Sequence, residues 1–202
     1  MLAAMHGQIW NASQIGQSLG LSYHTVNSYL DYLVGAFLIR RLPPLRPNIR
    51  KRLTKSPRVY WRDTGLLHSL LNAVEERSLL SQPWVGASWE GFVLEQVIGA
   101  LNSAGKHFDA FYFRTSDQYE LDPVLDVGKD RWATEVKLTT SPSPLDMTRL
   151  DKAAEMIGAA RRHLVSRTSR TSGIETRASC NLGWLLARLR NQHKSAGGPT
   201  RD

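Results

Sequence analysis

The sequence has little cysteine and no long apolar run. Cys180 is the only cysteine among 202 residues, which excludes an internal disulfide bond and any metal site built from several cysteines. A single cysteine also fits a reducing compartment, so we expect a cytoplasmic protein. No stretch approaches the ~20 apolar residues that a membrane-spanning helix needs. The first ten residues, MLAAMHGQIW, have no basic residue before their apolar start, so we expect neither a signal peptide nor membrane association.

Acidic residues are missing from one long segment. The chain carries a formal net charge of +8, and between Arg40 and Arg62 there is no Asp or Glu. Such a concentration of positive charge indicates a polyanion partner, with DNA expected, whereas the alternative is a solvated basic loop. The segment holds nine cations: Arg40, Arg41, Arg46, Arg50, Lys51, Arg52, Lys55, Arg58 and Arg62.

Residues 12–35 show the pattern of two helices with a tight break. The first helix, ASQIGQSLG, ends at Gly20, and Ser22 is a suitable N-cap for the second, YHTVNSYLDYLVG. The small Gly16 and the apolar Val26 fall where a helix-turn-helix needs a close contact and an anchor. An ordinary helical hairpin packs in a similar way, so this motif indicates DNA binding without requiring it.

Two short strand-like runs, AFLIRRL and PRVYWRD, follow the helix pair. Together they would form a basic wing beside a recognition helix. The polar and aromatic side chains at the start of that helix have the reach to contact phosphates or base edges. His24 is better explained as a surface or phosphate-contacting histidine than as a metal ligand. The candidate nucleic-acid-binding residues are Tyr23, His24, Thr25, Arg50, Lys51, Arg52, Lys55 and Arg58.

The remainder alternates helix and strand patterns. A helix capped by Asp63 and a long helix over 85–105 precede three strand-like runs, FDAFYFRTS, YELDPVLDV and RWATEVKLT. A helix near 144–160, a strand RRHLVSR and a last helix NLGWLLARLR follow. The order predicts an α+β protein whose mixed sheet is flanked by helices. We assign the helix-turn-helix and wing to 1–62, the sheet domain to 63–190 and a disordered tail to 191–202.

The strand WATEVKLTT holds Glu135 and Lys137, which share one face because they are two residues apart. A hairpin with the preceding strand would set Asp122 beside Glu135. Neighbouring carboxylates repel unless a cation or proton lies between them, and Mg²⁺ or Mn²⁺ favours such oxygen ligands. These are components of metal-assisted phosphodiester hydrolysis, with Asp122 and Glu135 as ligands. The alternative is a structural ion pair.

Further carboxylates are weaker candidates. Glu90, on the long helix, would add a carboxylate, or it is a polar position beside an apolar stripe. Glu95 points roughly 140° away from it on a helix, so both cannot face one site. Glu120 and Asp126 share a strand face with Asp122 and are spare ligands.

Five segments in this order resemble a known family: YLDYLVGAFLIRRLPPL, KRLTKSPRVYWRDTGLL, WEGFVLEQVI, YFRTSDQYELDPVLD and TEVKLTTSP. Across residues 10–165 the chain resembles the C-terminal region of bacterial and archaeal AAA+-type ATPases, a domain of unknown function (DUF4143). The resemblance implies a winged helix followed by a fold like the PD-(D/E)xK restriction endonucleases. It also implies that Glu90 is the helix glutamate, Asp122 the core aspartate, and Glu135 with Lys137 the ExK element.

Two features depart from that family. The chain has no G-x-x-x-x-G-K-[ST] motif, so we expect no ATP site in it. Pro123 directly follows Asp122 where the family usually has a bulky apolar residue, and proline favours sheet edges or bulges. A displaced Asp122 carboxylate would weaken catalysis without changing the fold.

Three functions are consistent with these observations. The first is a DNA-associated module with Mg²⁺- or Mn²⁺-dependent nuclease activity, in which Lys137 orients water or phosphate. The second is an inactive DNA- or partner-binding module that regulates a fused or separate ATPase domain, or that acts as a homo-oligomer. The third is a winged-helix transcription regulator whose second domain senses a signal or dimerises.

Overall fold

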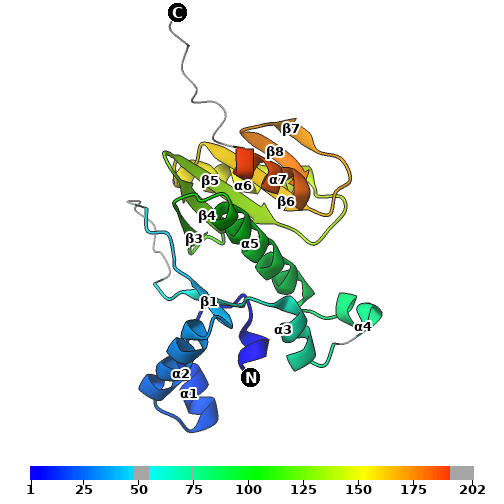
Figure 1. Cartoon of the computed structure of the whole chain (residues 1–202). Coiled ribbons are helices and arrows are strands. Elements are labelled where there is room, and N and C mark those ends of the chain that lie inside the picture. Colours follow the sequence, from blue (N-terminus) through cyan, green and yellow to red (C-terminus); the bar gives the residue numbers. More distant parts are fainter. Residues whose placement is uncertain (48–54, 74, 192–202) are drawn as a thin grey trace, which may run out of the picture.

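The computed structural model describes residues 1–47, 55–73 and 75–191. Helices and a small hairpin form the N-terminal part, and a six-stranded mixed sheet with flanking helices forms the larger part (Figure 1). The predicted α+β class is confirmed. Three predicted DNA-binding residues, Arg50, Lys51 and Arg52, lie outside the described residues, as does the predicted tail beyond residue 191.

The N-terminal helix pair follows a 3₁₀ turn, η1 (Leu2–Met5), and consists of α1 (Ala12–Leu19) and α2 (Tyr23–Gly35). The predicted cap is confirmed, because the Ser22 hydroxyl accepts a hydrogen bond from the Thr25 N–H at 3.1 Å. A side-chain cap of this kind satisfies one of the free N–H groups in the first helical turn.

Two glycines allow the tight break between these helices. Gly20 has φ 67°, the left-handed conformation that glycine adopts without steric cost, and it ends α1. A Cβ on Gly16 would lie 2.5 Å from the Leu21 carbonyl oxygen. The predicted turn at Gly20 is therefore confirmed, and Gly16 does make a close contact, although its neighbour is the turn residue Leu21 and not the second helix.

An antiparallel hairpin follows, made of β1 (Ile39–Leu42) and β2 (Arg58–Trp61), within the two predicted strand runs. Asp63 caps the next helix, α3 (Thr64–Leu70), by accepting a hydrogen bond from the Leu66 N–H at 2.7 Å. A short helix, α4, covers Glu76–Leu80 and was not predicted.

The larger sheet has the strand order β3-β4-β5-β6-β8-β7. Its first three strands are antiparallel neighbours, β5, β6 and β8 run parallel, and β7 returns antiparallel to β8. The strands are β3 (Phe108–Arg114), β4 (Glu120–Val127), β5 (Asp130–Val136), β6 (Arg161–Ser166), β7 (Ser172–Ile174) and β8 (Arg177–Asn181).

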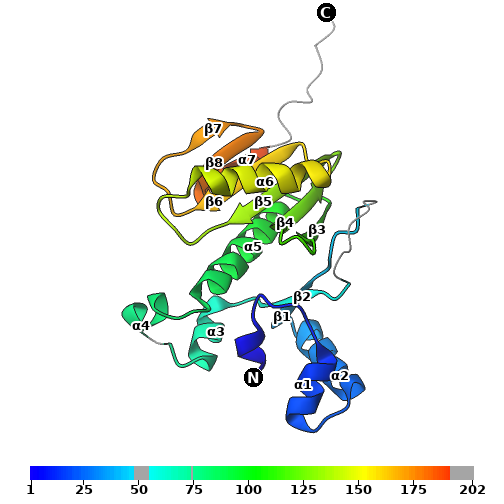
Figure 2. The same ribbon diagram turned by 180° about the vertical axis from the view of Figure 1, so that it is seen from behind.

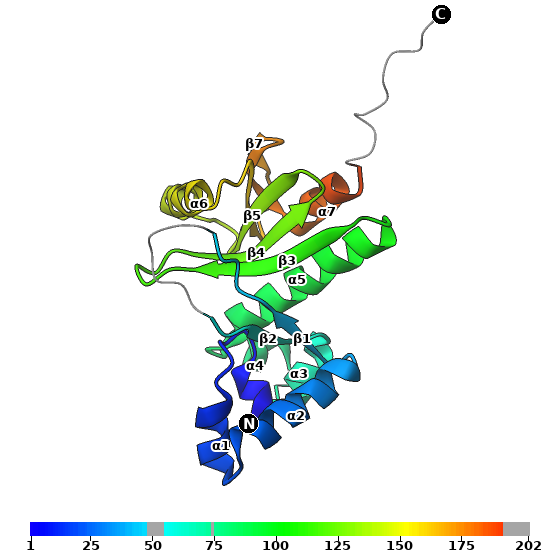
Figure 3. The same ribbon diagram turned by 90° about the vertical axis from the view of Figure 1, so that its left-hand side faces the viewer.

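Helices cover both faces of this sheet (Figures 2 and 3). On one face α5 (Val85–Ser103) and α7 (Leu182–Asn191) pack over a core that contains Trp132 and Leu125. On the other face α6 (Pro144–Met156) buries its own apolar side against β4, β5 and β6. No helix in the described part of the chain is long and apolar enough to cross a membrane.

The structure differs from the sequence prediction at the far edge of the sheet. The β7–β8 hairpin was not predicted, because its residues are short runs with many polar side chains and little alternation. Predicted to reach about residue 160, α6 ends at Met156, just before Gly158, which has φ 65°. In an L-residue this conformation is sterically costly, so a glycine here ends the helix.

Pro123 lies at a bulge. Phe111 pairs with Val124 and Phe113 with Leu121, so two residues of β4, Asp122 and Pro123, face the single residue between the phenylalanines. A bulge leaves a residue outside the ladder and so tolerates a proline, which has no N–H to donate. The predicted preference of Pro123 for a bulge is confirmed.

The two parts share a core. Leu42 and Tyr60 of the hairpin pack with Leu94 and Ile98 of α5 and with Tyr112 of β3, and all five side chains are buried. The segment after β1 also runs beside the edge strand β3: Tyr112 donates its N–H to the Pro43 carbonyl (2.9 Å) and accepts from the Leu45 N–H (2.7 Å). This contact covers the free edge of β3.

We therefore predict that both parts unfold together and that Leu94→Ala destabilises them both. Truncating a buried leucine costs about 2–5 kcal/mol of unfolding free energy. The matched control is Leu145→Ala, because Leu145 is 70% exposed and surface changes stay within about 0.5 kcal/mol. Urea unfolding, followed by far-ultraviolet circular dichroism and by tryptophan fluorescence, measures the unfolding free energy of each variant. Two separate transitions, only one of them shifted, would contradict a shared core.

Candidate carboxylate site

The site lies where β4, β5 and α5 meet the N-terminal hairpin. The β4–β5 register pairs Leu125 with Trp132 and ends with Val124 opposite Ala133. Asp122 and Glu135 lie beyond that last pair, and both line one cavity. Because β5 lies between β4 and β6, Glu135 stands on an interior strand of the sheet.

Lys137 follows the end of β5 and lies beside Glu135. Its Nζ is 2.7 Å from Glu135 Oε1, and its backbone N–H donates to the Val165 carbonyl on β6 at 2.9 Å. The Glu135 side chain is 18% exposed and that of Lys137 is 42% exposed. The two residues share one strand face, as predicted, and form an ion pair there.

Asp122 has partners that the sequence did not predict. Its Oδ2 accepts hydrogen bonds from the Tyr60 hydroxyl (2.9 Å) and from Arg58 Nη1. The same guanidinium pairs with Glu120 through Nη2. Arg58 and Tyr60 both come from β2, two residues apart, and therefore reach across from the N-terminal hairpin on one strand face. Arg58 also lies over the Tyr112 ring, 5.2 Å from its centroid.

A cavity of about 630 Å³ collects these groups. Its inner wall contains Glu90, Asp122 and Glu135, the three predicted carboxylates, together with Arg58 and Lys137. The turn between β3 and β4 and one side of α6 form the remaining walls, and both project from the same side of the sheet in Figure 3. The structure thus brings the four residues Glu90, Asp122, Glu135 and Lys137 to one cavity.

Burial controls the acidities in this cavity. It raises the pKa of Glu90 to about 7, with the nearby Asp122 carboxylate adding to the effect. Burial likewise raises the pKa of Asp122 and of Glu135, although Arg58 opposes the rise at Asp122 and Lys137 opposes it at Glu135. Burial is the largest single influence on Arg58 and by itself would lower its pKa, but Asp122, Tyr60 and Glu90 together outweigh burial and raise that pKa. Arg58 therefore stays charged.

The donor set does not fit a divalent cation in this arrangement. Oxygen ligands suit Mg²⁺ and Mn²⁺, but Asp122 is bonded to Arg58 and Tyr60, and Glu135 is bonded to Lys137. Within the described residues, no group of three or more His, Cys, Asp or Glu side chains is arranged to hold a metal ion. A cationic side chain already neutralises each of the two predicted metal ligands.

The spare carboxylates have other partners. Glu95 receives hydrogen bonds from Arg40 and Arg62, so it faces the N-terminal part and away from the cavity, as helical geometry predicts. Asp126 forms a two-pronged pair with Arg131, at 2.6 and 2.7 Å. Glu120 lines the cavity but pairs with Arg58.

The predicted nucleic-acid-binding residues are spread over two regions. Tyr23 and His24 are exposed, with ring centroids 3.9 Å apart, and Thr25 is half-buried at the start of α2. Lys55 is exposed beside the basic segment. Arg58 is different, because its side chain is only 8% exposed and is bonded to Asp122. It points into the cavity and away from the solvent.

Sequence reasoning missed the role of Arg58 and the two basic residues by which α6 lines the cavity, Arg149 and Lys152. A signal for Arg58 was present, since Arg58 and Tyr60 alternate in a strand and so face one side. For α6 the spacing of three between Arg149 and Lys152 places both on one helix face. Neither spacing predicts which side chains the strand face or the helix face contacts in the folded protein.

Because burial raises the pKa of Glu90 to about 7, we predict that the contribution of Glu90 to stability falls as pH rises. The folded chain holds a proton on Glu90 that the unfolded chain loses above about pH 4.5, so this contribution is lost between about pH 4.5 and 7, by roughly 3 kcal/mol. Glu90→Gln should remove this contribution from the pH dependence and be more stable than the native chain at pH 8.

Urea unfolding at several pH values measures this effect. The matched control is Glu155→Gln, the same chemical change at a side chain that is 66% exposed, which should keep the native dependence. An equal slope in the native chain and Glu90→Gln would contradict the assignment.

Comparison with known proteins adds family information. Residues 1–77 match the family described as "Domain of unknown function (DUF8612)", and residues 85–184 match "Domain of unknown function (DUF4143)". The DUF4143 resemblance seen in the sequence is thus confirmed for its C-terminal portion, and the N-terminal portion falls in a second family. No solved structure matches the chain with statistical significance.

Two mycobacterial proteins are similar to this chain. They are "Uncharacterized protein Rv2008c" of Mycobacterium tuberculosis and "Uncharacterized protein Mb2031c" of Mycobacterium bovis, each 41% identical over 143 residues. The matched region is 71% of this chain but 32% of each relative, so the chain spans about a third of the length of these curated relatives. The chain thus matches the DUF8612 family over its N-terminal part and the DUF4143 family over its C-terminal part.

Proposed function

We propose that this chain is a DNA-binding module, made of a winged helix and a restriction-endonuclease-like domain, that works within a longer protein of the AAA+-type ATPase family. The order of elements supports the second domain: α5, the antiparallel β3-β4-β5, the crossover helix α6 and the parallel β6. That order is the one expected for the PD-(D/E)xK fold that the sequence resembles.

The helix pair with its hairpin supports the winged helix. Tyr23, His24 and Thr25 at the start of α2 would face DNA, and the connection between β1 and β2 carries most of the basic run. Residues 1–39 contain no Lys or Arg. Since the neutralisation of phosphates provides most non-specific affinity, the helix pair would contribute contacts but little electrostatic attraction.

One observation carries the proposal: Glu90, Asp122, Glu135 and Lys137 line one cavity, while Arg58 of the N-terminal hairpin neutralises Asp122. The four residues that line the cavity match the acidic and basic positions of the nuclease fold. The ion pair between Arg58 and Asp122 favours DNA binding without cleavage, because it leaves Asp122 bonded to a side chain of the protein. The N-terminal part and the carboxylate cavity would then act as one unit.

A second candidate, a metal-dependent nuclease, is favoured by the same four residues. It requires that Asp122 exchange Arg58 for a metal ion. A buried and doubly hydrogen-bonded carboxylate is costly to release. We therefore favour a module that binds DNA without cleaving it over a metal-dependent nuclease.

The test combines DNA binding with cleavage. We expect the native chain to bind duplex DNA with an affinity that falls steeply with salt, by about 0.9 in log K per phosphate contact for each tenfold change. We also expect supercoiled plasmid to remain intact with Mg²⁺ or Mn²⁺, equally for the native chain and for Lys137→Ala.

The outcomes separate the candidates. Nicking by the native chain but not by Lys137→Ala would establish the nuclease and overturn binding without cleavage. No binding, or binding that is indifferent to salt, would overturn both DNA-directed functions.

A further inference from the structure

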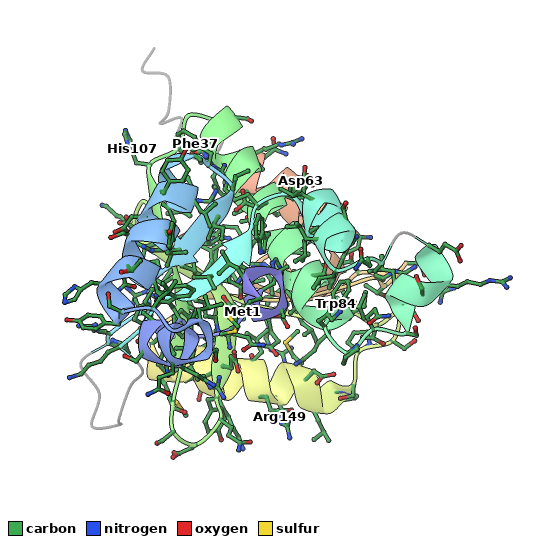
Figure 4. All side chains as sticks on the ribbon, turned by 90° about the horizontal axis from the view of Figure 1, so that it is seen from below. Met1, Phe37, Asp63, Trp84, His107 and Arg149 are labelled. Atoms are coloured by element: carbon green, nitrogen blue, oxygen red, sulfur yellow. The ribbon has the colours of Figure 1, made fainter. Side chains whose placement is uncertain are left out.

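One side of α6 forms a basic wall of the cavity. Arg149 and Lys152 both line the cavity and both are exposed, and the spacing of three places them on one helix face. Arg149 projects from the outer side of α6 in Figure 4. Leu145, one turn earlier and 70% exposed, continues the same face.

The charges of α6 are sorted between two faces. Asp151 pairs with Arg162 at 3.3 Å and with Arg177 at 2.8 Å, and Glu155 pairs with Arg162 at 3.4 Å. Two of the three acidic residues of this helix are thus bonded to arginines of β6 and β8. By contrast, Arg149 and Lys152 form no ion pair within the described residues.

The other cations of the cavity are engaged. Arg58 is bonded to Asp122 and Glu120, and Lys137 to Glu135. Asp146 is used as well, because its carboxylate accepts from the Ser143 N–H at 2.9 Å in the capping box of α6. The inner wall therefore balances much of its own charge, and the rim on α6 presents two positive charges to an incoming ligand.

We propose that Arg149 and Lys152 bind phosphate groups of a DNA strand at the mouth of the cavity. This proposal rests on the proposed DNA-binding function, and it names the side chains that hold the strand. Arginine binds a phosphate through two parallel N–H groups, and lysine binds it as a point charge. A cavity of about 630 Å³ has the size of sites that enclose small ligands, so it can admit the nucleotide between two such phosphates.

A phosphate site on α6 would also compensate for the lack of basic residues in the N-terminal helix pair. The first 39 residues have no Lys or Arg, so a strand that contacts α2 gains little electrostatic attraction there. A second anchoring point on α6 would supply phosphate contacts in addition to those of the basic run. The inner wall, where Asp122 and Glu135 are paired with cations, adds little attraction for a phosphate, so the strand would be held at the rim.

The experiment measures binding of a fluorescein-labelled duplex and of the matching single strand by anisotropy, between about 50 and 200 mM salt. We compare the full native chain with Lys152→Ala, Arg149→Ala and the control Lys129→Ala. Lys129 is also exposed and lies on the β4–β5 turn, at the opposite end of that hairpin from Asp122. Equal thermal unfolding midpoints verify that the variants are folded.

Each cavity variant should lower the slope of log K against log salt by the value for one phosphate contact, about 0.9 on the duplex or about 0.7 on the single strand, on at least one of the two probes. Lys129→Ala should keep the native slope on both. If Lys152→Ala and Arg149→Ala match Lys129→Ala while the native chain binds, the phosphate site is overturned and the DNA-binding function stands. If the native chain binds neither probe, both are overturned.

Discussion

The ion pair between Arg58 and Asp122 is the interaction on which the arrangement of this protein depends. It joins the N-terminal hairpin to a middle strand of the sheet at the floor of the carboxylate cavity. Burying a charge is costly unless it is paired and hydrogen-bonded, and here Tyr60 completes the coordination of Asp122. The positive charge that compensates the buried Asp122 carboxylate comes from Arg58, in the N-terminal part of the molecule.

Other contacts hold the same junction in register. His6 accepts the Trp61 N–H at its Nδ1 (3.0 Å), while its Nε2 lies 3.1 Å from the Ala87 carbonyl at the start of α5. Burial lowers the pKa of His6 to about 4, so the ring is neutral at physiological pH and donates through Nε2. A Cβ on Gly91 would lie 2.5 Å from that nitrogen. The junction is therefore closely packed, and a structural change in the N-terminal part would be felt at Asp122.

Local patterns in the sequence predicted most of the fold and half of the site. Ser22, Gly16 and Gly20 act within a few residues of themselves, so their roles could be identified without tertiary information. The same holds for Glu135 with Lys137, which share a face by strand geometry alone. The partner of Asp122 could not be predicted, because Arg58 is 64 residues away in the chain and reaches Asp122 only after the hairpin packs on α5. The run of positive charge around Arg58 suggested an exposed position, but this side chain is buried.

The most direct test of this account is a double-mutant cycle on Arg58 and Asp122, with unfolding free energies measured in urea. Arg58→Met and Asp122→Asn should each cost about 3–5 kcal/mol, because each leaves a buried polar partner uncompensated. The double variant should cost less than the sum of the two by roughly 1–3 kcal/mol, as expected for residues in direct contact. Costs that add to within about 0.5 kcal/mol would show that the two residues are energetically independent, and would contradict the central role of this pair.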